Sequence, residues 1–276
     1  MRILVKIGGA QLEETAPRAQ LCQAVAAARR AGHEVVIVHG GGNQIRQLVG
    51  ELGLPDRYHD GLRITDARTA EVVLMVLGGQ VNRTLVAALQ RASVPAVGLT
   101  GADGGTFAAR KLLRPGVELG YVGSIDCVRP RLVEALLDDD FTPVIATVAP
   151  GVHGDQSAPF FNINADHAAA PLCKAFACDA LLFLTDVPGV RGQDGQVLRT
   201  LLPRDCERLV ATGVASGGML PKLDAALLAV KENPRARIVI APAGEPDAVL
   251  AALRPDVGTT FRPDAQAQAA AEALHG

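Results

Sequence analysis

The hydrophobic positions of this chain fall into short continuous runs that alternate with longer segments of helical periodicity. Apolar runs occupy residues 3–7, 35–38, 96–99, 142–148, 180–184 and 237–240, and glycine or proline follows each within a few positions. Such runs are typical of strands that are buried on both faces. Between them, segments such as 20–31 and 165–176 carry apolar residues at helical spacing. The alternation predicts an α/β protein with helices on both faces of a mainly parallel sheet.

One helical segment is apolar on more than one side. Residues 67–91 follow Thr65 and Asp66, two candidate caps, and their apolar side chains wrap around more of the helix than one sheet can cover. We therefore expect this helix to have two packing partners. No linker or repeat divides the chain, so any two lobes, 1–176 and 177–276, must share the sheet. Residues 263–276 carry no buried face and are expected to form a tail.

Composition narrows the class of function. The 276 residues include 27 basic and 29 acidic side chains, and aromatic residues make up 3%. Neither a basic surface nor stacking platforms for nucleic acid are expected from these values. Five cysteines without a C-x-x-C pair indicate neither a disulfide framework nor zinc. The N-terminus, with Arg2, Lys6 and Gly8, leaves no apolar stretch long enough for a signal peptide or a membrane span. We expect a cytoplasmic protein with a small-molecule substrate.

Three consecutive glycines, Gly40, Gly41 and Gly42, stand between the run 35–38 and a helix expected to begin near Asn43. Backbone without Cβ atoms can approach an anion closely, and the free N–H groups of a first helical turn point at it. A tight turn alone would explain one glycine, but three favour anion binding. Neither G-x-x-x-x-G-K-[ST] nor G-x-G-x-x-G is present, so this is no P-loop or dinucleotide fingerprint.

Lysine is scarce, with five in the chain, so each can be considered individually. Lys6 ends the first strand, two residues before Gly8, and parallel strands place their carboxyl ends at one edge of a sheet. It is either a solvated lysine or a ligand of the anion expected there. Lys222 follows Pro221 at the start of a helix, where the dipole disfavours a cation. An anion should therefore compensate it.

Four further polar residues are candidates for the same edge. Asp166 lies in the first turn of a helix that Asn164 can cap, a position that the helix dipole alone would explain. Asn162 can donate to a carboxylate ligand, and Arg63 could fork onto a carboxylate or pair with a neighbouring aspartate. His39 is more typical of a packed or hydrogen-bonding histidine than of a catalytic base. The six histidines show no metal-binding spacing.

Six motifs occur in a specific order between Lys6 and Phe261. They are K-x-G-G at 6–9, HGGGN at 39–43, GLRIT at 61–65, NINAD at 162–166, TDVPGV at 185–190 and GGMLPK at 217–222. Together they resemble the amino acid kinase family, and within it the members that phosphorylate N-acetyl-L-glutamate. The resemblance implies a three-layer αβα sandwich and transfer of the ATP γ-phosphoryl to a side-chain carboxylate, giving N-acetyl-L-glutamyl 5-phosphate in arginine biosynthesis.

The resemblance also implies roles for the lobes and for individual residues. Residues 1–176 would bind the acyl amino acid and form a homodimer through the helix at 67–91, and residues 177–276 would bind ATP, whose oxygens and water would hold most of the Mg²⁺ shell. Lys6 and Lys222 would stabilise the transferring group, and Asp166 would orient both lysines. Gly41, Gly42, Arg63 and Asn162 would bind the acceptor or phosphoryl, whereas Gly9, Asp186, Gly189, Val214 and Ser216 would line the nucleotide.

Alternatives stay open at this point. The same fold could phosphorylate N-acetyl-aminoadipate or N-succinylglutamate, because one methylene is worth only about 1 to 3 kcal/mol of discrimination. A nucleotide-binding protein without catalysis is a second alternative. Arginine-sensitive relatives resemble one another in an extra N-terminal helix that couples them into rings. Because five residues precede Lys6 here, we expect no such helix, no rings and no inhibition by arginine.

Overall fold

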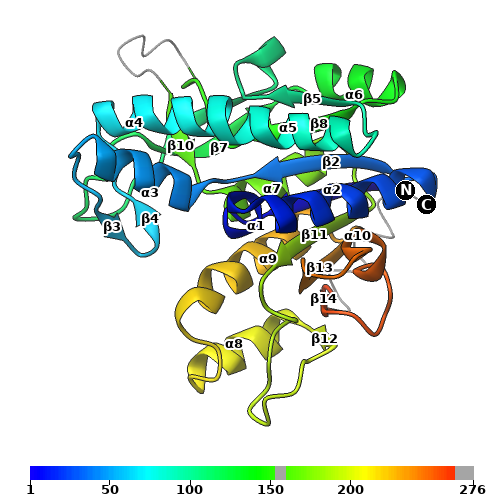
Figure 1. Cartoon of the computed structure of the whole chain (residues 1–276). Helices are drawn as coiled ribbons and strands as arrows, with labels where there is room; N and C mark the ends of the chain where they lie inside the picture. Colours follow the sequence, from blue (N-terminus) through cyan, green and yellow to red (C-terminus); the bar gives the residue numbers. More distant parts are fainter. Residues whose placement is uncertain (153–159, 265–276) are drawn as a thin grey trace.

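An eight-stranded sheet runs through the described chain, residues 1–152 and 160–264 of a computed structural model (Figure 1). Its strand order is β12-β14-β13-β11-β1-β2-β8-β5. The strands are β1 (Arg2–Ile7), β2 (Glu34–His39), β5 (Ala96–Leu99), β8 (Thr142–Ala146), β11 (Ala180–Thr185), β12 (Thr200–Leu201), β13 (Arg237–Pro242) and β14 (Thr259–Phe261). All neighbours pair in parallel except β13 and β14, so the predicted mainly parallel sheet is confirmed.

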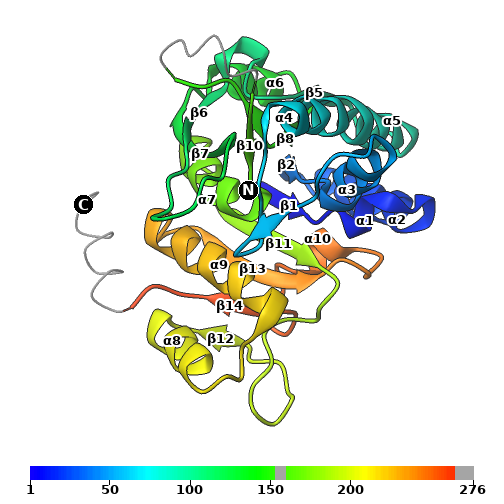
Figure 2. The same ribbon diagram turned by 90° about the vertical axis from the view of Figure 1, so that its left-hand side faces the viewer.

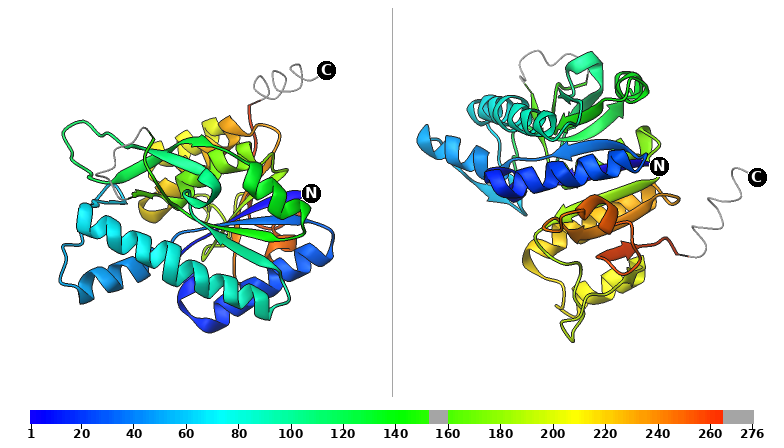
Figure 3. Two further views of the ribbon diagram at one scale, coloured as in Figure 1. Left: turned by 90° about the horizontal axis from the view of Figure 1, so that it is seen from above. Right: turned by 45° about the vertical axis from the view of Figure 1, so that its right-hand side comes forward.

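Helices cover both faces of this sheet and make three layers, as the sequence predicts (Figures 1 and 3). One face packs against α1 (Ala10–Glu13), α2 (Thr15–Arg30), α3 (Gly42–Glu51), α4 (Ala67–Leu74), α5 (Asn82–Arg91) and α10 (Ala248–Ala251). The other packs against α6 (Arg131–Asp138), α7 (Ala165–Ala175), α8 (Pro203–Ala211) and α9 (Leu220–Glu232). Alternation along β1 sends Val5 to the first core and Leu4 to the second. Lys6 therefore lies on the α7 side of the sheet.

The expected long helix at 67–91 is continuous but changes its winding. A π-helical segment, η1 (Met75–Val81), joins α4 to α5, and the Asp66 carboxylate caps α4 by accepting a 2.8 Å hydrogen bond from the Thr69 amide. By length and composition alone this 25-residue helix, whose most apolar 18-residue window has a mean hydropathy of 1.6, could cross a membrane. The sequence-based expectation concerned the N-terminus and did not consider this helix. Half of that window is buried within the protein.

Two smaller sheets lie beyond the carboxyl ends of the main strands. One contains β6 (Phe107–Lys111), β7 (Val122–Val128), β9 (Val148–Ala149) and β10 (Phe161–Ile163), and the other is the β3 (Tyr58–His59) and β4 (Leu62–Arg63) hairpin. Short 3-10 turns, η2 (Asp103–Gly105) and η3 (Gly217–Met219), complete the described elements. These sheets carry Arg63 and Asn162 toward the main sheet.

The two halves of the main sheet meet where β1 pairs with β11, with Lys6 in register with Phe183. Helices α7 and α9 lie side by side across this junction (Figure 2). Asn164 caps α7, as its sequence position predicts, by accepting from the amides of Asp166 and His167. The junction therefore places the N-terminal turn of α7 beside the end of β1. Of the expected tail, residues 265–276 lie outside the described part of the chain.

Candidate active site

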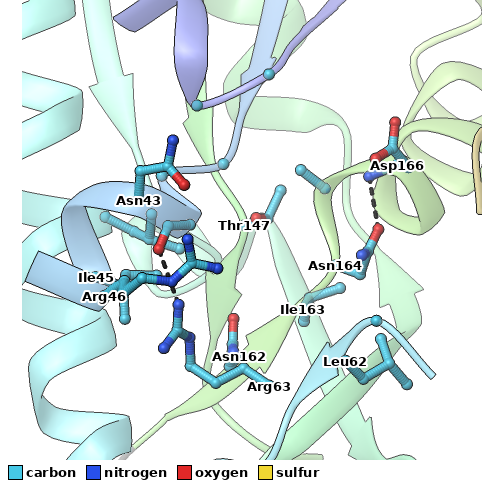
Figure 4. Close-up of a pocket in the computed structure, with 18 of the residues that line it drawn as sticks. Asn43, Ile45, Arg46, Leu62, Arg63, Thr147, Asn162, Ile163, Asn164 and Asp166 are labelled. Carbon is cyan, nitrogen blue, oxygen red and sulfur yellow. Dashed lines mark hydrogen bonds between the residues drawn. The ribbon is translucent and has the colours of Figure 1, made fainter. Parts of the chain in front are cut away.

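A cavity of about 250 Å³ opens at the carboxyl ends of β1 and β2 (Figure 4). Its lining comes from the turns after these two strands, the β3–β4 hairpin, β10 and the first turn of α7. It includes seven residues selected from the sequence: Lys6, Gly9, Gly41, Gly42, Arg63, Asn162 and Asp166. The edge at which parallel strands end is where ligands bind in α/β sheets. The structure therefore brings these seven residues together at one edge of the sheet.

Two glycines of these turns, Gly9 and Gly41, are packed too closely for a side chain. A Cβ on Gly9 would lie 3.2 Å from the Gly42 nitrogen, and one on Gly41 would lie 2.8 Å from Leu77 of η1. A Cβ on Gly40 would meet the Cβ of Ala165 at 3.4 Å. Close packing, against the backbone of Gly42 for Gly9 and against η1 side chains for Gly41, accounts for these two glycines rather than a left-handed φ angle. The result is a wall of main chain facing the cavity.

Gly42 differs from its neighbours because it faces open space. It is the first residue of α3, and a Cβ on it would meet no described atom within 4 Å. No side chain caps α3, so the amides of its first turn remain available on the cavity side. An uncapped helix N-terminus with free N–H groups is suited to an anion.

Lys6 supplies a buried positive charge next to these amides. Its ammonium lies 2.7 Å from the Asp166 Oδ1, and the two side chains are 8% and 16% exposed. Burial of a charged pair at this depth is tolerated only because each partner compensates the other. The pair thus holds the ammonium at the cavity wall in a defined position.

Arg63 is also buried, with both ends of its guanidinium engaged. Its Nη1 pairs with Asp56, its Nη2 donates to the Gly42 carbonyl at 2.8 Å, and its Cζ lies 4.8 Å from the Tyr58 ring centroid. Burial, and to a lesser degree Arg46, lowers its pKa to about 10, so the group stays charged at neutral pH. Sequence reasoning allowed this aspartate pairing but did not identify Asp56 or Tyr58.

Asn162 belongs to the same polar wall. Its Nδ2 donates to the Thr65 Oγ1 at 3.2 Å, and that hydroxyl donates to the Arg63 carbonyl at 2.7 Å. The strand β10 therefore fixes the β4 hairpin through one side-chain contact. An amide and a guanidinium on one wall match the groups that bind a carboxylate and an acyl amide.

Lys222 is not among the residues that line this cavity. It lies half-buried in the first turn of α9 and makes no ion pair or hydrogen bond within residues 1–152 and 160–264. Its neighbour Pro221 approaches the β3–β4 turn, because a Cβ on Gly61 would lie 3.9 Å from the Pro221 Cγ. Gly61 lines the cavity, so α9 begins at its rim. Among the described residues, Asp166 forms its ion pair with Lys6 and not with Lys222.

The other C-terminal candidates follow β11 and precede α9, outside this cavity. Asp186 is exposed and accepts a 2.8 Å hydrogen bond from Thr185. Gly189 has a φ of 145°, and a Cβ there would lie 2.7 Å from Val197. Val214 is half-buried and packs on the second core, whereas Ser216 is exposed and begins η3. Asp186 and Gly189 therefore lie in the loop after β11, whereas Val214 and Ser216 lie just before η3.

Gly217 and Gly218 leave open space at the start of η3, since a Cβ on either would meet no described atom within 4 Å. Together with the unpaired Lys222 and the uncapped α9, this geometry fits a phosphate chain. Protein side chains alone do not form a metal site in the described ranges, because no group of three or more His, Cys, Asp or Glu side chains there could hold a metal ion. Carboxylates fit Mg²⁺ here only as part of a shell completed by phosphates and water.

His39 is a packed, hydrogen-bonded histidine, as predicted. It is fully buried, its Nδ1 lies 2.9 Å from the Gly40 carbonyl, and its Nε2 lies 3.0 Å from Asn82. Sequence reasoning missed Asn82, although one asparagine within an apolar helix was a signal. The geometry as a whole combines a carboxylate-binding wall, a glycine turn and two lysines, which suits transfer of a phosphoryl group to an acid.

Comparison with known proteins agrees with this class of site. Residues 1–240 match the model of the amino acid kinase family, and the chain belongs to this family. The acetylglutamate kinase of Koribacter versatilis is 46% identical over 226 residues, covering 82% of this chain and 84% of that protein. The acetylglutamate kinase of Solibacter usitatus is 41% identical over 249 residues, covering 90% and 94%.

A solved structure extends the comparison to the fold. The crystal structure of smu.665 from Streptococcus mutans UA159 superposes with a TM-score of 0.80 at 28% identity, covering 95% of this chain and 98% of that one. The predicted three-layer fold is therefore confirmed, and the kinase class that the motifs indicate is confirmed with it.

Proposed function

We propose that this chain transfers the γ-phosphoryl group of ATP to the side-chain carboxylate of N-acetyl-L-glutamate, giving N-acetyl-L-glutamyl 5-phosphate in arginine biosynthesis. The carrying observation is the buried Lys6–Asp166 pair, which holds an ammonium 2.7 Å from its counter-ion beside the glycine turn. Relatives named acetylglutamate kinase, up to 46% identical, support this acceptor over the aminoadipate and succinyl alternatives. A catalytically inactive nucleotide-binding protein is not favoured, because Lys6, Asp166 and Lys222 are all present.

The acceptor occupies the cavity of about 250 Å³ in this proposal. Arg63 and Asn162 bind the carboxylate that does not react and the acetylated amine region. The amides of Gly41 and Gly42 face the reacting carboxylate and the phosphoryl. This half of the site lies within residues 1–176.

ATP lies along residues 177–276, where Asp186, Gly189, Val214 and Ser216 line it, and Gly9 of the other half completes this lining. ATP supplies the phosphoryl group, and Mg²⁺ neutralises its phosphate oxygens. Lys222 reaches the phosphates from the first turn of α9, whose N-terminus has no side-chain cap. The approach of Pro221 to the β3–β4 turn brings this lysine to the boundary between the two substrates.

Phosphoryl transfer to an ionised carboxylate requires no proton removal, so the residues act by position and charge. Lys6 and Lys222 face the charge that develops on the transferring oxygens, and Asp166 orients Lys6 directly. The N–H groups at the start of α3 add a fixed positive potential at the same point. The side chains of Leu77 and Val81, packed behind Gly41, keep these groups from relaxing during the reaction.

Assembly and compartment complete the proposal. A homodimer formed through η1 would cover Met75, which is 54% exposed on an otherwise apolar helix. All five cysteines are free, which suits the reducing cytoplasm.

A substrate panel tests the function. ADP release is measured with N-acetyl-L-glutamate, N-acetyl-L-aminoadipate, N-succinyl-L-glutamate and L-glutamate, each with and without Mg²⁺. We expect the highest kcat/KM for N-acetyl-L-glutamate and trapping of the acyl phosphate as a hydroxamate. Binding of ATP without ADP release on any acid would overturn the proposal.

A further inference from the structure

A fully buried polar network lies behind the glycine turn, on the face of the sheet opposite Lys6. His39 and Asn82 are both 0% exposed, and their side chains approach to 3.0 Å. Neither side chain lines the cavity. Buried polar groups of this kind are costly unless every donor and acceptor is satisfied, so their arrangement needs a reason.

The contacts of Asn82 determine the orientation of its amide. Its Nδ2 lies 2.9 Å from the Val144 carbonyl, which can only accept, and its Oδ1 lies 2.7 Å from Nη2 of Arg83, which can only donate. The same Nδ2 must then donate its second hydrogen to the Nε2 of His39. His39 is therefore a neutral imidazole with its proton on Nδ1, and this proton is donated to the Gly40 carbonyl at 2.9 Å.

The surrounding chain leaves space for this asparagine. A Cβ on Gly98 of β5 would lie 1.8 Å from the Asn82 Oδ1, so a side chain at Gly98 and this rotamer of Asn82 are incompatible. Asn82 also stands directly after the π-helical η1, and π-helical turns interrupt α-helices mainly at functional sites. The absence of a side chain at Gly98 and the π-helical turn before Asn82 together allow the Asn82 side chain to reach His39.

The peptide bond carries this restraint to the cavity. In a trans peptide the carbonyl of one residue and the N–H of the next point in opposite directions. The described chain contains no cis peptide bond. Holding the Gly40 carbonyl toward His39 therefore turns the Gly41 N–H away from it. That N–H has no hydrogen-bond acceptor among residues 1–152 and 160–264.

We propose that Asn82 and His39 are positioning residues that aim the Gly41 amide at the transferring phosphoryl group. The restraint acts from behind the turn through the Gly40–Gly41 peptide, while Leu77 and Val81 of η1 block the Gly41 Cα from moving back. Burial also lowers the pKa of His39 to about 4, so the neutral form that this arrangement needs persists at physiological pH. This inference rests on the proposed function, because only that function supplies a phosphoryl group as the target of the Gly41 amide.

The test compares two buried asparagines. Asn82→Leu removes both donated hydrogen bonds, and Asn233→Leu removes the equivalent pair that Asn233 donates to the Ala170 and Ala229 carbonyls, away from the cavity. We expect Asn82→Leu to lower kcat by about 10 to 100-fold while KM for the acid changes by less than about 3-fold. Asn233→Leu should leave kcat within about 2-fold of wild type at a similar loss of Tm. Equal effects on kcat, or none from Asn82→Leu, would overturn the proposal.

A second measurement needs no substrate and no assay of activity. Nitrogen-15 NMR of histidine-labelled wild-type protein, with His39→Gln used to assign the signal, should show the Nδ1–H tautomer at pH 7. An Nε2–H tautomer or an imidazolium would overturn the network. This measurement separates the two hypotheses, because a wild-type protein inactive on N-acetyl-L-glutamate would remove the proposed function while the tautomer still reports on His39.

Discussion

The Lys6 ammonium and the Asp166 carboxylate lie 2.7 Å apart and join the penultimate residue of β1 to the first turn of α7. Both side chains are largely buried, so neither charge has water as a substitute partner. The pair therefore links the sheet to the helix and places a cation beside the glycine turn in a single contact.

Loss of either lysine at the site should lower the rate of the chemical step. We expect Lys6→Met and Lys222→Met each to lower kcat by about 10² to 10⁵-fold, with a smaller change in ATP affinity, because both face transition-state charge. Lys174→Met, on the exposed end of α7, is the matched control and should retain wild-type turnover. Steady-state kinetics with detection of ADP measure kcat for all three variants. Full activity of Lys6→Met would exclude Lys6 from the mechanism.

Gly42 and Gly50 both lie in α3 and both face open space, yet we expect opposite outcomes from adding a methyl group. Gly50→Ala should raise the free energy of unfolding by about 0.5 to 1 kcal/mol and leave activity intact. Gly42→Ala should not lower stability but should reduce kcat/KM at least about tenfold, because the methyl group enters the anion site. Urea unfolding and kinetics of the two variants provide the comparison; an active Gly42→Ala enzyme would mean that no ligand approaches this residue.

Arg63→Ala should mainly raise KM for the acyl amino acid. A charge-assisted hydrogen bond contributes about 1.5 to 3 kcal/mol, which corresponds to an increase of about 10 to 150-fold. The expected effect on kcat is small, because the carboxylate that it binds does not react. Arg68→Ala, with an exposed side chain on α4, serves as the control. A change confined to kcat would contradict this role.

Acid should destabilise the protein through His39. Burial lowers its folded-state pKa from 6.5 to about 4. Between these values the unfolded chain binds a proton that the folded chain does not, so the stabilising contribution is complete above pH 6.5 and is lost as pH falls toward 4. The full effect is on the order of 3 kcal/mol.

Urea unfolding of wild type and His39→Gln from pH 7.5 to 4.5 measures this contribution. The difference between the two proteins should shrink as pH falls. His167→Gln must be measured alongside, because burial also lowers the pKa of His167, against the opposing charges of Asp166 and Asp224. A pH-independent difference for His39→Gln would show that the imidazole titrates normally.

Dimerisation should depend on the exposed side of η1. Met75→Glu introduces a charge into this apolar surface, and we expect it to convert a dimer into a monomer at micromolar concentration. Multi-angle light scattering gives the mass directly. Val210→Glu, on an exposed apolar residue of α8, is the control and should leave the mass unchanged. A monomeric wild-type protein would reject the assembly.

Local signals explain what the sequence could predict. Asn164 caps α7 and Gly40 to Gly42 form a strand-to-helix turn because these features depend on neighbouring residues alone. The carboxyl ends of parallel strands then meet at one edge by geometry, which brings Lys6 to the glycine turn.

Contacts between distant segments could not be derived in this way. Asp56 and Tyr58 around Arg63 depend on how the β3–β4 hairpin folds back, and the link from Asn82 to His39 depends on the π-helical turn at Met75–Val81. The residues next to Arg63 and next to Asn82 in the sequence do not indicate which distant side chain each of them contacts. Tertiary packing selects these pairs, and they complete the site.

The pairing of β1 with β11 also has a consequence for biosynthesis. The ribosome makes β1 early, and β2 can satisfy one of its edges soon afterwards, but the other edge waits for Ala180–Thr185. At about 5 to 20 residues per second, this edge stays without its partner for roughly 10 to 35 s during translation. An unpaired apolar strand edge invites pairing with other chains. Synthesis of this protein therefore includes a period in which its central strand is exposed to aggregation, and that period ends only when the second half of the sheet has emerged.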